Sequence, residues 1–399
     1  GMANWDLNRY NSVTALDMKL VIQKYIDMDK RIILKILPSS KVEPTEELVD
    51  RNKMPSSNGD ILFIPPKIQR TELSNGLKLL VIEDSKLPLV EVTTILNSGW
   101  AADPLDKPGA GALTADLLDE GTKKRNALEI AEEAKRLGTD IGTISHFDGT
   151  YISFNSLKKN LDSSFELMAD MILNPTFPEK ELERKKQEYL GRIQQENKQP
   201  ITAAIKQYFR LLFGSDHPYG QPYTGSGTEE SISAINRDDL VAFYTNNYFS
   251  NNASVVIAGD ITLNEVKIKL EKYLGKWRTG KLAISEVLDP EPRKSTDVYL
   301  IDKPGAPQSV IIMGNLGLRR SDPDYLSTYV MNTAFGSQFT SRLNMNLRED
   351  KGYTYGTGSF FSSRKGIGPF ACYAPVQTQY TKASIQELLN ELNDLVGPR

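Results

Sequence analysis

Residues 109–122 read GAGALTADLLDEGT, a short helical frame of small and apolar residues that closes on Gly-Thr. The stretch contains no histidine or cysteine, and its acidic residues are Asp116, Asp119 and Glu120. A tetrahedral zinc site takes three protein ligands, so this stretch predicts no metal site of its own. Its acidic residues are interpreted as a solvated helix end.

The two histidines of the chain do not supply the missing ligands. His146 is expected in the middle of a strand, in TISHFDGTYISF, and His217 is expected in a loop, in HPYG. Both histidines are predicted to be structural.

Two longer stretches carry a family resemblance. Residues 75–104 (NGLKLLVIEDSKLPLVEVTTILNSGWAADP) resemble the opening hairpin and core strands, and residues 217–260 the domain-closing helix and strand, of the insulinase/pitrilysin family of zinc metallopeptidases. The resemblance runs from about Thr71 to the C-terminus. It implies an α+β fold, with tandem repeats of a mixed β-sheet flanked by helices, of the metallopeptidase-like or LuxS-metallohydrolase-like kind.

In that family the frame of residues 109–122 carries His-x-x-Glu-His. Two histidines four residues apart reach zinc from one helix face, and the glutamate polarises the metal-bound water. Alignment on the closing Gly-Thr places Ala112 and Asp116 at the histidine positions and Ala115 at the glutamate position. The third ligand, a glutamate, would fall near Gly191–Ile193, where no carboxylate stands. The resemblance therefore implies no cofactor in this chain and zinc in a partner half.

A second family motif lies in LNMNLREDKGYTYGTGSFF, residues 343–361. The resemblance assigns Arg348 and Tyr355 as the pair typical of the non-zinc half, which donates hydrogen bonds to the substrate carbonyl as it becomes an oxyanion. The alternative is structural: Arg348 ends a helix, where a cation suits the dipole, and Tyr355 fills the start of a strand. Tyr353 is expected on the same strand face as Tyr355 and is a substitute donor.

Composition excludes several classes of protein. The 399 residues are 39% hydrophobic and 25% charged, a length and composition that suit two domains. The net charge of −3 does not indicate a surface that binds nucleic acid. No apolar run approaches the roughly 18 residues of a membrane span. The single cysteine, Cys372, excludes an internal disulfide and is expected to be a buried thiol. None of this distinguishes a periplasmic from a cytoplasmic protein.

The chain contains an internal repeat. Residues 12–37 (SVTALDMKLVIQKYIDMDKRIILKIL) repeat the pattern of residues 234–259, namely a capping residue, an acidic first turn, a helix ending in tyrosine, a polar turn and a strand, here Ile32–Leu37. Chance similarity is the alternative. Residues 234–259 form the last helix and strand of a domain. Residues 12–37 are therefore predicted to form the last helix and strand of a preceding domain.

The repeat and the proline-rich segments predict the domain organisation. The final domain lacks a closing helix and strand, so residues 14–37 are expected to dock there, in cis or by swapping. The predicted divisions are a fragment of a preceding similar domain (1–40), a linker (41–68), a peptidase-like domain with the degenerate zinc motif (69–278), a second linker (279–296) and a truncated peptidase-like domain with the Arg/Tyr motif (297–399).

The resemblance implies the non-zinc half of a pitrilysin-like zinc metalloendopeptidase, inactive alone. Such a half encloses peptide substrate and supplies transition-state donors to a zinc-bearing half, located upstream in the same polypeptide or in a separate subunit. Two alternatives remain open. One is an inert scaffold subunit like the core proteins of the cytochrome bc1 complex, against which retention of Arg348 and Tyr355 argues. The other is a peptide-binding, chaperone-like module.

Overall fold

The computed structural model describes residues 2–26, 28–32, 34–35, 64–281 and 287–397, and the chain divides into two units, Gly1–Ile64 and Pro65–Arg399. The first unit contains α1 (Met2–Ser12), α2 (Ala15–Tyr25) and a 3-10 turn, η1 (Met28–Lys30). None of the helices in the described ranges combines the length and apolar character needed to cross a bilayer.

Helix α2 forms as the repeat predicts. The Thr14 hydroxyl accepts a hydrogen bond from the Asp17 backbone amide, and the Asp17 carboxylate accepts one from the Thr14 amide, which is a capping box. The predicted strand Ile32–Leu37 is wrong where it is described, because residues 32, 34 and 35 belong to no strand. A strand needs a partner for its backbone groups, and the unit offers none in its described part. The other residues of that prediction lie outside the described residues.

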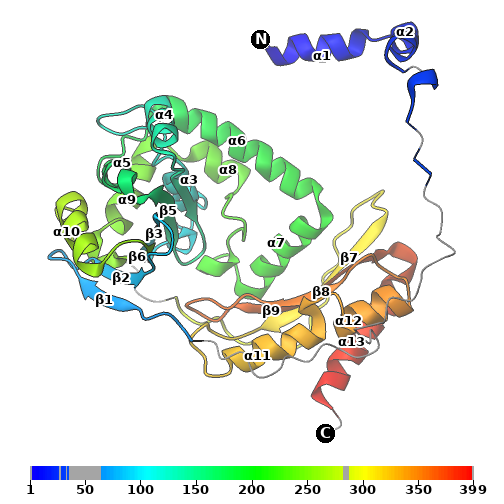
Figure 1. Cartoon of the computed structure of the whole chain (residues 1–399). Coiled ribbons are helices and arrows are strands. Elements are labelled where there is room, and N and C mark those ends of the chain that lie inside the picture. Colours follow the sequence, from blue (N-terminus) through cyan, green and yellow to red (C-terminus); the bar gives the residue numbers. More distant parts are fainter. Residues whose placement is uncertain (1, 27, 33, 36–63, 282–286, 398–399) are drawn as a thin grey trace, which may run out of the picture. The chain divides into compact units, whose positions relative to one another are not determined.

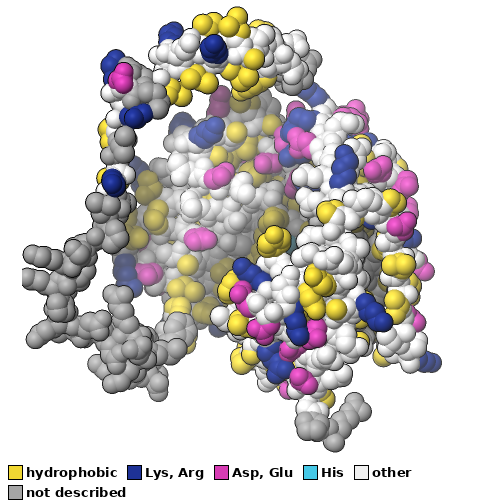
Figure 2. Space-filling model, turned by 90° about the vertical axis from the view of Figure 1, so that its right-hand side faces the viewer, with side chains coloured by type: hydrophobic (Ala, Val, Ile, Leu, Met, Phe, Trp, Pro, Cys, Tyr) yellow, Lys and Arg dark blue, Asp and Glu magenta, His cyan; other side chains and the backbone are white. Residues whose placement is uncertain are grey.

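Apolar side chains of the first unit lie on its surface, as Figure 2 shows. Those of α2 are more than half exposed at Leu16, Met18, Leu20, Val21 and Ile22. Because the two units are described separately, docking of residues 14–37 into the final domain stays a prediction.

The second unit begins with a six-stranded mixed sheet, which confirms the predicted fold class (Figure 1). The strand order is β1-β2-β6-β3-β5-β4, with β2 and β6 parallel and all other pairs antiparallel. The last strand in sequence, β6, inserts between two early strands. The strands are β1 (Gln69–Glu72), β2 (Lys78–Glu83), β3 (Leu89–Leu96), β4 (Gly142–Ser145), β5 (Thr150–Leu157) and β6 (Ala253–Gly259).

Eight α-helices accompany this sheet in the described residues. All of them except α7 bury apolar side chains in one large core with the sheet, and the buried side chains of α7 belong to a separate aromatic cluster with Tyr219. The helices are α3 (Ala110–Asp116), α4 (Ala127–Leu137), α5 (Leu161–Leu173), α6 (Glu179–Lys198), α7 (Pro200–Phe213), α8 (Glu229–Ala234), α9 (Arg237–Asn247) and α10 (Leu263–Leu274). Short 3-10 turns lie at η2 (Trp100–Ala102), η3 (Lys158–Asn160), η4 (Pro218–Gly220) and η5 (Ser250–Asn252).

Within the second unit, the segment of residues 297–397 contains a smaller antiparallel sheet of order β7-β9-β8, which α7 contacts (Figure 1). Its strands are β7 (Gln308–Leu316), β8 (Gly358–Phe361) and β9 (Pro369–Gln377). Its helical segments are α11 (Tyr325–Asn332), α12 (Arg342–Asn344), α13 (Thr381–Val396), the π-helical turns η6 (Thr333–Ser337) and η7 (Met345–Asp350), and the 3-10 turn η8 (Thr378–Tyr380).

One predicted strand of this domain is shorter than expected. The stretch YTYGTGSFF enters the sheet only at Gly358. The Tyr353 amide donates instead to the Leu347 carbonyl, and the Thr354 hydroxyl to the Pro375 carbonyl. These bonds outside the strand ladder hold the segment before Gly358 as a turn.

The two sheets differ at one edge. In the first sheet, β6 pairs with both β2 and β3. In the second, no strand of the described residues pairs with the outer edge of β7, and residues 298–301 are exposed and belong to no strand. The second sheet therefore leaves one side of β7 open.

Candidate functional site

Helix α3, which carries the degenerate motif, is buried and held at its start by Asp103. The two carboxylate oxygens of Asp103 accept hydrogen bonds from the backbone amides of Gly109, at 2.7 Å, and Gly111, at 2.6 Å. Gly109 has a φ of 102°, which favours glycine. A Cβ at Gly111 would lie 2.7 Å from the Phe243 ring. Burial raises the pKa of Asp103 to about 8.

Of the three motif positions, Asp116 is the one with a recorded contact to α6. Ala112 and Ala115 are buried and offer no donor atom, while Asp116 Oδ2 accepts a hydrogen bond of 2.8 Å from the Tyr189 hydroxyl on α6. The Arg192 guanidinium lies 4.5 Å from the centre of the Tyr189 ring. Residues 191–193, where the third ligand was sought, follow Tyr189 directly in the same helix.

The prediction that Asp116 belongs to a solvated helix end is wrong. Desolvation raises the pKa of Asp116, opposed by the hydrogen bond from Tyr189. Its neighbour Asp119 has one buried carboxylate oxygen with no hydrogen-bond partner among the described residues, and burial followed by the charge of Glu120 raises the pKa of Asp119 to about 6. Glu120 pairs with Arg184 at 2.6 Å and with Lys185 at 3.1 Å. The acidic end of the frame therefore packs against α6.

The residues present do not fit a zinc ion. Alanine has no lone pair to offer at either position, and Asp116 accepts from a tyrosine that is 1% exposed. Across the described ranges, the structure brings together no group of three or more His, Cys, Asp or Glu side chains able to hold a metal. A tetrahedral site needs three ligands.

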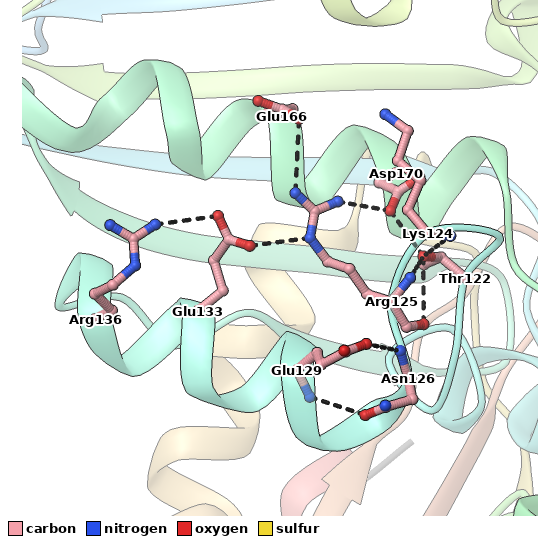
Figure 3. A network of polar contacts seen from close by, with 9 residues as sticks. All are labelled: Thr122, Lys124, Arg125, Asn126, Glu129, Glu133, Arg136, Glu166 and Asp170. Carbon is pink, nitrogen blue, oxygen red and sulfur yellow. Dashed lines mark hydrogen bonds and ion pairs between the residues drawn. The ribbon is translucent and has the colours of Figure 1, made fainter.

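The loop that follows α3 is fixed by a charged network (Figure 3). Arg125 binds Asp170 at 2.8 Å and Glu133 at 2.9 Å, and the Thr122 hydroxyl donates to the same Asp170 carboxylate at 2.7 Å. The Asp170 side chain is only 2% exposed. A buried carboxylate is tolerated when its lone pairs are satisfied, so this network is structural and holds the closing Gly-Thr in place.

Arg348 and Tyr355 lie on the final domain. The Arg348 guanidinium lies 4.3 Å from the centre of the Phe339 ring, and its Nε is 3.4 Å from Glu349 Oε1. Tyr355 is 91% exposed, and within the described part of the chain its hydroxyl has no hydrogen-bond partner. Among the described residues, no hydrogen bond, ion pair or ring contact joins Arg348 to Tyr355 or joins either of them to α3.

Tyr353 does not share the surroundings of Tyr355, contrary to prediction. Its ring stacks on that of Tyr380 with centroids 4.4 Å apart. The segment is a turn, so the strand alternation that placed both tyrosines on one face does not apply. Tyr353 is therefore a packing residue in this structure.

The histidines occupy loops. His146 lies in the turn between β4 and β5, so its predicted position within a strand is wrong. The position of His217 before the turn η4 agrees with the prediction, and its Nδ1 accepts a hydrogen bond from the Tyr219 amide.

Sequence reasoning missed Tyr189 and Arg192. The helical spacing of α6 predicts that both side chains lie near Asp116 only once it is known that α3 faces α6. No sequence motif indicates that the Tyr189 hydroxyl binds a residue of the degenerate zinc motif.

Comparisons with known proteins agree on the family. A model described as insulinase (peptidase family M16) matches residues 78–216, and a model described as peptidase M16 inactive domain matches residues 234–397. An uncharacterized zinc protease of Rickettsia bellii is 25% identical over 323 residues, covering 81% of this chain and 76% of its own length. An uncharacterized zinc protease of Bacillus subtilis is 25% identical over 329 residues, covering 82% and 78%.

Solved structures show the same fold. The crystal structure of a peptidase M16 inactive domain from Pseudomonas fluorescens has a TM-score of 0.78 at 26% identity, covering 84% of this chain and 80% of that one. The periplasmic protease PqqL of Escherichia coli has a TM-score of 0.67 at 14% identity, covering 82% of this chain and 38% of that one, a likeness of fold alone.

Proposed function

This chain belongs to the insulinase (peptidase M16) family, and from that premise we propose that it acts as the non-zinc half of a pitrilysin-like zinc metalloendopeptidase. In this role it encloses peptide substrate and presents hydrogen-bond donors to a reaction centred on a zinc-bearing half. That half is a separate subunit or a preceding part of the same polypeptide.

The observation that carries the proposal is the hydrogen bond between Tyr189 and Asp116. It occupies the place where α3 and α6 would supply metal ligands, with alanine at the other two motif positions. A chain with this arrangement has no means of activating a water molecule at α3. Peptide hydrolysis in this family requires zinc, so the cation has to come from another polypeptide segment.

The proposed role in donating hydrogen bonds to the substrate rests on Tyr355 and Arg348. An exposed phenol without an intramolecular partner is free to donate to a group outside this chain, and the aromatic contact with Phe339 restrains the Arg348 guanidinium. Preorganised donors of this kind stabilise a developing oxyanion, and removing one typically lowers the rate about 10²–10³-fold.

The test compares the protein alone with the protein joined to the zinc-bearing half encoded upstream or beside it, using a quenched fluorescent peptide. We expect no hydrolysis by the chain alone and chelator-sensitive hydrolysis by the complex. Tyr355→Phe and Arg348→Gln should each lower kcat of the complex with little change in KM. Hydrolysis by the isolated chain that survives Arg348→Ala and is abolished by a chelator would refute this division of roles.

A peptide-binding module that holds chains without cutting them is the second candidate. One observation favours it: the second unit has a cavity of about 510 Å³ whose mainly aromatic lining includes Trp100, Phe147 and Phe209. The two functions differ in one measurement, because a module binds labelled peptide well without any zinc-bearing partner.

A further inference from the structure

The turn that carries Tyr355 is anchored on both sides by buried hydroxyl groups. The Thr354 hydroxyl donates a hydrogen bond to the Pro375 carbonyl. The Thr357 hydroxyl donates one to the Tyr373 carbonyl at 2.7 Å. Both threonines are buried, whereas the Tyr355 side chain is exposed. The backbone of the turn is therefore fixed while the phenol itself faces solvent.

Asn344, in α12, joins this turn to a second segment through its side-chain amide. Its Oδ1 accepts a hydrogen bond from the Thr357 backbone amide at 3.1 Å, and its Nδ2 donates one to the Gln338 carbonyl at 3.1 Å. The side chain is buried. Because the oxygen meets a donor and the nitrogen meets an acceptor, this one amide satisfies two stretches of backbone that are separate in sequence.

Each partner of this bridging amide lies beside one of the two proposed donors. The Thr357 amide follows Tyr355 by two residues. The Gln338 carbonyl directly precedes Phe339, whose ring centre lies 4.3 Å from the guanidinium carbon of Arg348. A displacement of the bridging amide therefore reaches the support of both donors.

Asparagine is the residue type that this bridge requires. Leucine has a similar shape but offers neither a donor nor an acceptor. An ionised aspartate accepts from the Thr357 amide but has no proton to donate to the Gln338 carbonyl. The bond to the Thr357 amide is buried, so water does not readily replace it. The two substitutions at Asn344 therefore remove both bonds or only one of them.

We propose that Asn344 is a positioning residue, whose amide holds the Tyr355 turn and the Phe339 support of Arg348 in one fixed arrangement. The inference rests on the proposed function, because it takes Arg348 and Tyr355 as donors to the substrate carbonyl. Such donors stabilise an oxyanion when they are preorganised, and a misplacement of about 1 Å can lower a rate about 10²-fold. Asn344 is buried, so it acts through these two side chains and does not touch the substrate.

Asn346 provides a matched control two residues later in the chain. Its Nδ2 donates to Glu387 at 3.0 Å and to Glu391 at 2.8 Å, and both acceptors lie in α13. These bonds connect η7 to α13 and do not include the Tyr355 turn. Asn346→Leu therefore removes side-chain hydrogen bonds of the same kind and leaves the bridge at Asn344 in place.

The first measurement is amide hydrogen exchange of the full chain, read by mass spectrometry of peptides, and it needs no zinc-bearing half. Asn344→Leu should speed exchange at least tenfold in a peptide covering residues 353–358, because the Thr357 amide loses its acceptor. Asn344→Asp keeps that acceptor, so it should speed exchange mainly in a peptide covering residues 337–342. Asn346→Leu should change neither peptide.

The second measurement is hydrolysis of a quenched fluorescent peptide by the complex with the zinc-bearing half. Asn344→Leu should lower kcat about 10–10²-fold with little change in KM. In the Tyr355→Phe background the same substitution should lower kcat by a clearly smaller factor, because one of the donors that it positions is already gone. Asn346→Leu should leave kcat close to that of the wild type.

Unchanged exchange of residues 353–358 in folded Asn344→Leu would overturn the inference, as would an equal effect on kcat in the wild-type and Tyr355→Phe backgrounds. An equal loss of kcat in Asn346→Leu would assign the effect to general loosening and overturn it as well. Melting temperature is recorded for every variant. If Asn344→Leu does not fold, unchanged exchange of residues 337–342 in Asn344→Asp overturns the inference instead.

Failure of the proposed function gives a different result. Tyr355→Phe then leaves kcat of the complex unchanged, while exchange in Asn344→Leu is still faster. That combination removes the reaction that Asn344 would serve and so refutes the positioning role, although the bridge itself is present. Slow exchange in Asn344→Leu together with a large effect of Tyr355→Phe refutes the inference alone and leaves the proposed function standing.

Discussion

Replacing Tyr189 by phenylalanine tests the hydrogen bond that stands at the degenerate zinc position. The substitution keeps the buried ring and its contact with Arg192, and it removes only the hydroxyl that donates to Asp116 at 2.8 Å. A hydrogen bond to a charged group contributes about 1.5–3 kcal/mol. Asp116 is only partly buried, so water replaces some of this interaction and we expect a loss of about 1.5–2 kcal/mol in the free energy of unfolding.

The loss should depend on pH with a definite sign. The Tyr189 hydrogen bond lowers the pKa of Asp116 against the larger raising effect of burial. Without the hydroxyl, the pKa in the folded state rises further, and the folded variant takes up a proton at higher pH than the folded wild type. The cost of Tyr189→Phe is therefore largest where Asp116 is ionised and shrinks as pH falls through the raised pKa of Asp116.

Urea unfolding over a pH series from 8 down to 4 measures both quantities, and Tyr244→Phe provides the matched control. Tyr244 donates a 2.6 Å hydrogen bond to the neutral Ile172 carbonyl, so its loss should cost about 0.5–1.5 kcal/mol throughout the series. A cost for Tyr189→Phe that is below about 0.5 kcal/mol at pH 8, or that stays constant over the whole series, would refute the reasoning.

Three further changes have defined outcomes. Arg125→Met leaves the Asp170 carboxylate, 2% exposed, without its ion pair and should cost about 3–5 kcal/mol in urea unfolding, whereas Arg136→Met, at an exposed ion pair, should cost under about 1 kcal/mol. Burial raises the pKa of Asp119 to about 6, so between about pH 4 and 6 the folded state holds a proton that the unfolded state releases, and this lowers stability as pH rises; Asp119→Asn should remove this contribution of up to about 3 kcal/mol while the contribution of Asp103 remains, and a pH dependence identical to that of the wild type would contradict the assignment. Tyr355→Phe should leave the melting temperature unchanged, because the side chain is 91% exposed, while lowering kcat of the complex with a zinc-bearing half about 10²-fold; a marked loss of stability would indicate a packing role instead.

The sequence predicts those parts of the fold that short segments determine. The capping box of α2 begins at Thr14, and α9, the helix of the second copy of the repeated pattern, has a capping box between Asn236 and Asp239. These signals act within a few residues, so the chain itself carries them. The mixed sheet follows from resemblance rather than from local pattern, since β6 pairs with strands far away in sequence.

The failures share one cause, which is contact between distant segments. The sequence alone predicts a solvated Asp116, whereas in the structure the Tyr189 hydroxyl of α6 donates a hydrogen bond to it. The sequence alone predicts a strand before Gly358. In the structure the Tyr353 amide donates to the Leu347 carbonyl and the Thr354 hydroxyl donates to the Pro375 carbonyl, so the segment forms a turn. The cavity lined by Trp100, Phe209 and Arg364 has no sequence signal, because its walls come from segments far apart in the sequence.

The open side of β7 makes protein concentration an experimental variable. Alternate residues of Gln308–Leu316 direct their backbone amides and carbonyls to an edge that no described strand covers, while the residues between them bond to β9. Such an edge is a template for any extended polypeptide, including the same strand of a neighbouring molecule. Two molecules joined there would run antiparallel about a twofold axis and share one continuous ribbon, so dilution series belong beside every binding and unfolding measurement on this protein.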